Sequence, residues 1–302
     1  MYDLIIVGAG PGGLAAALDA HYLKLRTLVI EADKAGGALS QSYPWKGVDS
    51  FLGFHKKKGG EISDVIVRHV MDSGAEIKEN ECVLEITKGS HFSVKTSKGI
   101  YDSRTVIVAT GIRGTPRKLG VPGEDLTGVS YSVSDPSEMK GRNVLVVGGG
   151  DSAADCALGL EEAGANVWMA HRKDELRATD ENRESISRSS VKMLWSHEVV
   201  NFTGKDKLSG AVLSGKEGKK KLSIDNAVIC IGSLPSTSCL EKLGITAEGS
   251  SVKVDENCMT SVEGLFAAGD MISSLKRIPQ ALATGEKAVY AAYKMIKNPY
   301  WK

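Results

Sequence analysis

The chain contains one glycine-rich pattern twice, and this repeat limits its fold more than any other feature of the sequence. Residues 3–13 and 143–153 each start as a short β-branched run, pass through G-x-G-x-x-G or its Ala-ended form, and enter an Ala/Leu-rich stretch. Such a pattern predicts a buried parallel strand, a tight turn and a helix. Two copies in 302 residues therefore predict two doubly wound, Rossmann-like α/β domains that each bind a dinucleotide.

Three small residues have separate tasks in each copy. The first allows the tight turn from strand to helix, the second lets a pyrophosphate approach the backbone, and the third lets the helix pack close to the strand. The phosphates then meet the unpaired N–H groups and the positive dipole end of the helix. These residues are Gly8, Gly10 and Gly13 in the first copy, and Gly148, Gly150 and Ala153 in the second.

The two copies differ where the ribose is expected. Glu31 comes 18 residues after Gly13, at the position where a carboxylate binds ribose hydroxyls. The same count from Ala153 reaches His171, which begins a basic cluster of His171, Arg172, Lys173 and Arg177. Because a carboxylate repels a ribose 2′-phosphate and Arg binds one, the second copy is predicted to prefer NADPH over NADH. A solvated basic turn is the alternative interpretation of this cluster.

The remaining sequence predicts how the two domains are arranged along the chain. A Pro/Gly-rich linker covers residues 113–128. The strand-like segment 264–270 has no counterpart in the repeat, and the chain after the second copy is too short for a domain of its own. We therefore predict a discontinuous first domain, residues 1–115 and 240–302, and a second domain, residues 116–239, with the second boundary near residues 232–238. A helix with Pro near its start is predicted over 279–296.

Charge and leader sequence narrow the classes of function. The 38 Lys and Arg residues balance 37 Asp and Glu residues, for a net charge of +1, so no global field draws the chain to nucleic acid or to a membrane. No apolar run reaches the roughly 18 residues of a membrane helix. The first strand-like run has no basic segment before it, so we expect a cytoplasmic protein.

The metal-binding and thiol residues are scattered. The six histidines form no ligand cluster, so no metal site is predicted. No two of the five cysteines are separated by two residues, which argues against a dithiol redox motif or a zinc site. We expect them to be mostly buried small side chains. They are Cys82, Cys156, Cys230, Cys239 and Cys258.

Over essentially its whole length the sequence resembles the low-molecular-weight thioredoxin reductases, flavoproteins with two dinucleotide sites. The first copy is similar to their FAD site and the second to their NADPH site. Ala268-Gly269-Asp270 resembles the late FAD motif whose Asp binds the ribityl chain, and Arg277-Ile278-Pro279-Gln280 resembles the start of the helix beneath the flavin. The resemblance implies FAD binding by Gly8, Gly10, Gly13, Glu31, Ala32, Leu39, Tyr43, Gly111, Asp270, Pro279 and Gln280. It implies NADPH binding by Gly148, Gly150, Asp151, Ser152, Ala153, His171, Arg172, Lys173 and Arg177.

The redox Cys-x-x-Cys of thioredoxin reductases is missing. It lies just before their second glycine motif, where this chain has residues 130–136 without cysteine, so no thiol is there to exchange with a disulfide. Residues 36–44 instead resemble the ferredoxin/flavodoxin–NADP reductases built on the same scaffold, in which the Tyr, here Tyr43, stacks on the isoalloxazine. Those reductases usually carry a C-terminal extension over the flavin. In its place we expect Tyr300 or Trp301 as a shortened lid.

The resemblance implies an FAD-dependent enzyme, a homodimer, that passes electrons from NADPH to a small carrier such as ferredoxin or flavodoxin without a cysteine pair. Lys56-Lys57-Lys58 lies beside the predicted flavin loop and could attract an acidic carrier, although a plain solvated loop is the alternative. An NAD(P)H oxidase or quinone reductase is the second hypothesis. A non-enzymatic flavin or nucleotide sensor is the third.

Overall fold

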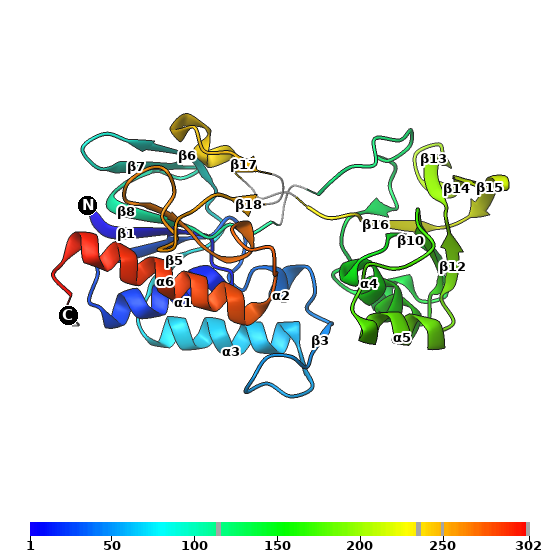
Figure 1. Cartoon of the computed structure of the whole chain (residues 1–302), viewed down its shortest axis with the longest axis horizontal. Helices are drawn as coiled ribbons and strands as arrows, with labels where there is room; N and C mark the ends of the chain where they lie inside the picture. The colour runs from blue at the N-terminus through cyan, green and yellow to red at the C-terminus, as the bar shows by residue number, and fades with distance from the viewer. Residues whose placement is uncertain (113–115, 234–236, 249–250, 300–302) are drawn as a thin grey trace. The chain divides into compact units, whose positions relative to one another are not determined.

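The computed structural model describes residues 1–112, 116–233, 237–248 and 251–299 (Figure 1). The chain forms two compact units, unit 1 from residues 1–115 and 233–302, and unit 2 from residues 116–232. The return to unit 1 at residue 233 lies within the predicted boundary region, residues 232–238. Cys239 and Leu240, which follow, are buried in the core of unit 1.

Unit 1 is built on a sheet of seven strands in the order β5-β2-β1-β8-β7-β6, with β19 also paired to β8. The pairs among β1, β2, β5, β8 and β19 are parallel, whereas β6, β7 and the first half of β8 form an antiparallel meander. The segment predicted at 264–270 thus completes the sheet of the first copy as β19. The bounds are β1 Tyr2–Val7, β2 Thr27–Ile30, β5 Glu76–Lys78, β6 Val83–Lys88, β7 Phe92–Thr96, β8 Ile100–Val108 and β19 Leu265–Ala267.

One face of this sheet is covered by a layer of three helices, α1, α3 and α6 (Figure 1). Helices α1 and α6 approach each other closely because glycines face each other: a Cβ on Gly285 would lie 2.0 Å from the carbonyl oxygen of Gly12. The helices span Pro11–Tyr22, Gly59–Asp72 and Ile278–Ile296. Shorter elements of unit 1 are α2 Ala38–Gln41, β3 Gly47–Val48, β4 Lys57–Lys58, η2 Ser238–Leu243, β17 Ala247–Glu248, β18 Ser251–Val252 and η3 Gly269–Met271.

Unit 2 has a five-stranded parallel sheet in the order β12-β11-β10-β16-β9, with α4 packed on one face and a three-stranded antiparallel sheet, β13-β14-β15, packed by the other. The two points where the chain enters and leaves unit 2 are joined, since the Arg117 amide donates to the Gly232 carbonyl at 3.0 Å. The bounds are β9 Val129–Ser130, η1 Pro136–Met139, β10 Asn143–Gly148, α4 Asp151–Glu162, β11 Asn166–His171, α5 Asp180–Arg188, β12 Lys192–Trp195, β13 Glu198–Gly204, β14 Leu208–Gly215, β15 Gly218–Ser223 and β16 Asn226–Cys230.

In the main sheet of each unit, the strand order changes direction beside the glycine-rich turn. In unit 1 the chain passes from β1 to β2 on one side, and β8 lies on the other; in unit 2, β10 lies between β11 and β16 in the same way. In open α/β sheets ligands bind at this switch point, beyond the carboxyl ends of the strands. The predicted fold of two doubly wound domains is thus confirmed. In the part of the chain that is described, no helix is both long and apolar enough to cross a membrane.

Candidate dinucleotide sites

The glycine turn of unit 1 is made of closely packed backbone. Gly8 has φ +101°, and a Cβ there would lie 2.6 Å from the Ala109 carbonyl oxygen, while a Cβ on Gly13 would lie 1.9 Å from the Gly8 oxygen. Gly10 is the N-cap of α1 and has no side chain to cover the first-turn amides. Gly37, which precedes α2, approaches so closely that a Cβ on it would lie 2.8 Å from the Gly10 Cα. The helix N-terminus is therefore open to an anion.

Glu31 is fixed at the end of β2 by this turn. Its Oε2 accepts a hydrogen bond from the Ala9 amide at 2.7 Å, and its Oε1 accepts one from the Asp33 amide at 3.0 Å. Each carboxylate oxygen can accept a further bond, so the side chain is fixed in position and retains the capacity to accept hydrogen bonds from hydroxyl groups. Ala32, also predicted here, is exposed beside it.

Asp270 has the character expected of a ligand-binding carboxylate. Burial raises its pKa, and Lys276 opposes this rise only in part. Among the described residues, its carboxylate has no hydrogen-bond partner. A buried polar group without a partner is costly, so a carboxylate in this state fits the hydroxyl chain of a ligand. The preceding Gly269 amide is fixed by Thr284 Oγ1 of α6 at 2.9 Å.

The other predicted residues of unit 1 surround these groups at different depths. Leu39 is buried on α2, and Tyr43 is half-buried after α2, with its amide bonded to the Ala38 carbonyl at 3.0 Å. Pro279 and Gln280 are exposed in the first turn of α6, which contains no acidic residue. Its positive dipole end is therefore not neutralised locally. Gly111 has φ +64° with open space at its Cβ position.

The turn of unit 2 repeats this arrangement and leaves room at its tip. A Cβ on Gly148 would lie 2.3 Å from the Cys230 carbonyl oxygen and 2.9 Å from the Ala153 Cβ. By contrast, a Cβ on Gly150, the N-cap of α4, would have no described atom within 4 Å. The space over the first turn of α4 thus fits a pyrophosphate. Ser152 is exposed in that turn.

The basic loop after β11 is fastened to this turn by bonds that the sequence did not reveal. The Arg177 amide donates to the Gly149 carbonyl at 2.6 Å. Asp151 Oδ1 accepts from the Thr179 amide at 2.8 Å, the Thr179 hydroxyl at 3.0 Å and Asn182 Nδ2 at 2.8 Å. The only local signal was Thr179, whose hydroxyl caps α5. Asp151 is therefore a support of the loop as well as a residue of the turn.

His171 differs from the other members of the basic cluster. It is 8% exposed, its ring packs on Gly149, and its Nε2 has no partner among the described residues. Burial, and to a lesser degree the neighbouring cations, lower its pKa. Burial of the ring thus favours the neutral imidazole, whereas Arg172, Lys173 and Arg177 of the cluster are exposed. The unpartnered buried nitrogen fits a polar group of a bound ligand.

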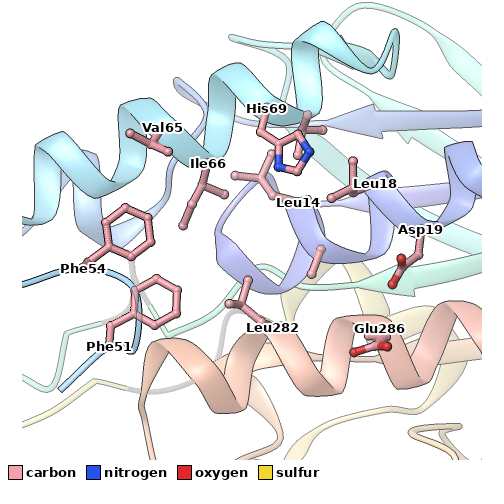
Figure 2. Close-up of a pocket in the computed structure, with 12 residues that line it drawn as sticks. Leu14, Leu18, Asp19, Phe51, Phe54, Val65, Ile66, His69, Leu282 and Glu286 are labelled. Atoms are coloured by element: carbon pink, nitrogen blue, oxygen red, sulfur yellow. The ribbon is translucent and has the colours of Figure 1, made fainter.

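A separate cavity of about 310 Å³ lies in the helical layer of unit 1 (Figure 2). The sequence did not predict this cavity. The stacked rings of Phe51 and Phe54, 4.9 Å apart, lie at one end. Asp19 of α1 and Glu286 of α6 lie at the other end (Figure 2). Burial, with repulsion from Glu286, raises the pKa of Asp19 to about 6. The apolar walls come from α1, α3 and α6.

This raised pKa predicts a stability that depends on pH. The folded pKa of Asp19 lies above its unfolded value, so its contribution to stability is complete below about pH 4 and is lost as the pH rises through 6. Asp19→Asn should therefore raise the free energy of unfolding at pH 7.5 by about 1 kcal/mol, after discounting for the half-exposed carboxylate. Thermal melts should show the difference shrinking between pH 6 and pH 4. Glu286→Gln should give a smaller change of the same sign; a difference independent of pH would contradict the assignment.

Comparisons with known proteins agree with this architecture. The profile of the pyridine nucleotide-disulphide oxidoreductase family matches residues 2–285. The chain is 38% identical to a ferredoxin--NADP reductase of Ignicoccus hospitalis, covering 100% of both chains. It is 35% identical to a thioredoxin reductase of Bacillus subtilis, covering 96% of this chain and 93% of that one.

Among solved structures, the thioredoxin reductase of Lactococcus lactis matches with a TM-score of 0.91 and 28% identity, covering 98% of this chain and 99% of that one. The resemblance found in the motifs is confirmed over the whole chain. The chain belongs to the pyridine nucleotide-disulphide oxidoreductase family, and it is an FAD-dependent NAD(P)H oxidoreductase.

Proposed function

We propose that this enzyme passes electrons from NADPH through FAD to a small carrier protein such as ferredoxin or flavodoxin, as a homodimer in the cytoplasm. The observation that carries the proposal is the absence of cysteine from residues 130–136, together with full-length similarity to a ferredoxin--NADP reductase. Bound FAD would supply the redox chemistry, because a flavin takes a hydride from NADPH and releases electrons singly or in pairs.

The residues of unit 1 would bind and orient FAD. Glu31 and Asp270 would accept hydrogen bonds from ribose and ribityl hydroxyls, and the first turn of α1 would receive the pyrophosphate. The open N-terminus of α6 favours negative charge nearby. Tyr43 is proposed to cover one face of the ring system. The further FAD residues proposed are Gly8, Gly10, Gly13, Ala32, Leu39, Gly111, Pro279 and Gln280.

The residues of unit 2 would bind NADPH. Gly148, Gly150 and the first turn of α4 would receive the pyrophosphate. The exposed cations after β11 would bind the 2′-phosphate, since Arg pairs with phosphate through two parallel hydrogen bonds. Asp151 would hold the loop that carries these cations. The further NADPH residues proposed are Ser152, Ala153, His171, Lys173 and Arg177.

The surface near α6 supports a protein as the acceptor. Lys56 and Lys58 are exposed, while Lys57 forms an ion pair with Glu61 at 2.8 Å. The three lysines follow the loop that contains Leu52, and the Leu52 side chain is 96% exposed. Arg277, the N-cap of α6, donates to Ser50 of that loop at 2.9 Å. An exposed apolar tip with cations beside it suits a carrier that has an acidic rim. The predicted lid residues, Tyr300 and Trp301, lie outside the described residues.

Carrier-dependent reduction of cytochrome c by NADPH tests this function. With ferredoxin or flavodoxin present, the rate should rise at least about tenfold, and it should fall as salt screens the encounter. Lys56→Glu should lower kcat/KM for the carrier and leave ferricyanide reduction unchanged, whereas the control Lys219→Glu on β15 should change neither activity. Turnover with oxygen or a quinone that equals turnover with carriers would favour the small-acceptor alternative. No NADPH oxidation with any acceptor would favour the sensor.

A variant without cysteine tests the electron path. Replacing all five cysteines by Ser or Ala should leave carrier reduction within about twofold, because transfer from flavin to carrier needs no thiolate. Flavin absorbance and circular dichroism would show that the variant folds and retains FAD. If that variant still takes hydride from NADPH but reduces no acceptor, a thiol lies on the path and the chain is a disulfide reductase.

A further inference from the structure

Two cysteines of unit 2 meet beneath the glycine turn. Cys156 is on the sheet-facing side of α4 and is 2% exposed, and Cys230 is the last residue of β16 and is partly exposed. Cys230 packs against the same apolar cluster that contains Cys156, and the neighbouring Cys230 thiol contributes to the raised pKa of Cys156. They are 74 residues apart in sequence, so only the fold brings them together.

Cys230 lies at the switch point of the sheet. It is paired in register with Gly148 on β10. A Cβ on Gly148 would lie 2.3 Å from the carbonyl oxygen of Cys230. β10 and β16 are the two strands between which the strand order changes direction, so their carboxyl ends form the floor of the crevice. Cys230 is thus in the floor, and Cys156 lies behind it under α4.

We propose that Cys156 and Cys230 form a reversible disulfide on exposure to a hydroperoxide and that this bond weakens dinucleotide binding in unit 2. In the first step the Cys230 sulfur attacks the peroxide, the O–O bond breaks, and Cys230 sulfenic acid and an alcohol or water form. In the second step the Cys156 sulfur attacks the sulfenic sulfur, the S–S bond forms, and water leaves. Two thiols are oxidised by two electrons, and the hydroperoxide is reduced. A dithiol reverses the change by exchange.

The roles of the two sulfurs follow from their surroundings. The neighbouring Cys230 thiol and burial raise the pKa of Cys156 well above its ordinary value, so Cys156 stays protonated and is shielded from solvent. Cys230 is the partly exposed member of the pair, so we expect an oxidant to reach its sulfur first. Cys156 is then in contact with the sulfenic acid and completes the bond.

The effect on binding follows from the tight packing of the turn. A disulfide would tie β16 to α4, the two elements that enclose the Gly148 turn. That turn tolerates little displacement, because a Cβ on Gly148 would lie 2.3 Å from the Cys230 carbonyl oxygen and 2.9 Å from the Ala153 Cβ. We expect the dissociation constant for NADPH to rise at least about fivefold on oxidation. This part rests on the proposed NADPH site, and bound NADPH should in turn protect Cys230.

The test oxidises the FAD-loaded protein with hydrogen peroxide, with and without NADPH, and blocks remaining thiols with iodoacetamide. Mass spectrometry should find a loss of about 2 Da and a peptide pair bridged between Cys156 and Cys230. Cys156→Ala and Cys230→Ala should each abolish the bridge, whereas Cys82→Ala, at an exposed thiol of unit 1, should retain it. Dithiothreitol should restore both the mass and the affinity for NADPH.

The outcomes separate this inference from the proposed function. Oxidation of Cys230 to sulfinic or sulfonic acid, or no modification at all, overturns the disulfide. A bridge that leaves the NADPH dissociation constant unchanged overturns its effect on binding. The binding of NADPH to the reduced protein is measured first, by titration, and its absence would count against the proposed function while the mass result for the cysteine pair stands.

Discussion

Arg172→Ala should raise KM for NADPH about 10- to 100-fold and leave KM for NADH within about twofold, since a hydrogen-bonded contact to a charged group contributes about 1.5–3 kcal/mol. Arg172 directly follows β11 and is exposed, and among the described residues it forms no ion pair, so its guanidinium is available to a phosphate. Only NADPH carries the 2′-phosphate. Steady-state kinetics with both cofactors, followed by flavin reduction in stopped flow, measure the effect.

Two further variants sharpen this result. Arg172→Lys keeps the charge but loses the planar pair of donors, so its KM for NADPH should lie between those of the wild type and the Ala variant. Arg188→Ala, which breaks an ion pair with Glu184 on α5, should change neither KM. An equal loss with NADPH and NADH, or a wild-type enzyme that uses both equally well, would contradict the 2′-phosphate assignment.

Gly285→Ala should destabilise unit 1 by about 3 kcal/mol or more and should yield protein with little FAD. Its Cβ would lie 2.0 Å from the carbonyl oxygen and 2.9 Å from the carbonyl carbon of Gly12. Because both atoms are backbone, no side chain can rotate away, and α1 and α6 must separate. Gly12 belongs to the glycine turn at the start of α1, so the displacement reaches the predicted pyrophosphate site.

The ratio of flavin to protein absorbance after purification, together with a thermal melt, measures this loss. Gly89→Ala in the turn between β6 and β7 is the matched control, because a Cβ there would meet no described atom within 4 Å. A Gly285→Ala protein that purifies with its full flavin content and an unchanged melting temperature would show that the two helices are not held as closely as described.

The features that the sequence predicted are those set by short stretches of chain. β-branched runs, glycines with positive φ and Pro near a helix start act within a few residues, so both turns and α6 could be recognised directly. Glu31 could be placed because its distance from Gly13 is fixed by one helix and one strand.

The features that the sequence did not predict depend on packing between distant segments. His171 looked like one more cation, yet burial against Gly149 lowers its pKa. The contact between Cys156 and Cys230 and the cavity beside Asp19 arise only when separate elements meet. Cys239 likewise carries no local sign that it belongs to the core of unit 1.

The hydrogen bond between Arg117 and Gly232 has an evolutionary and a practical meaning. Because the ends of unit 2 are adjacent, its whole sequence could have entered the loop of an ancestral flavin-binding domain as one insertion without stretching the host, as tolerated insertions do elsewhere. Because its two ends are adjacent, unit 2 is also a segment that can be replaced as a whole. We expect that exchanging it for a related module, cut at these two residues, changes the preference for NADPH or NADH while unit 1 keeps its own sequence.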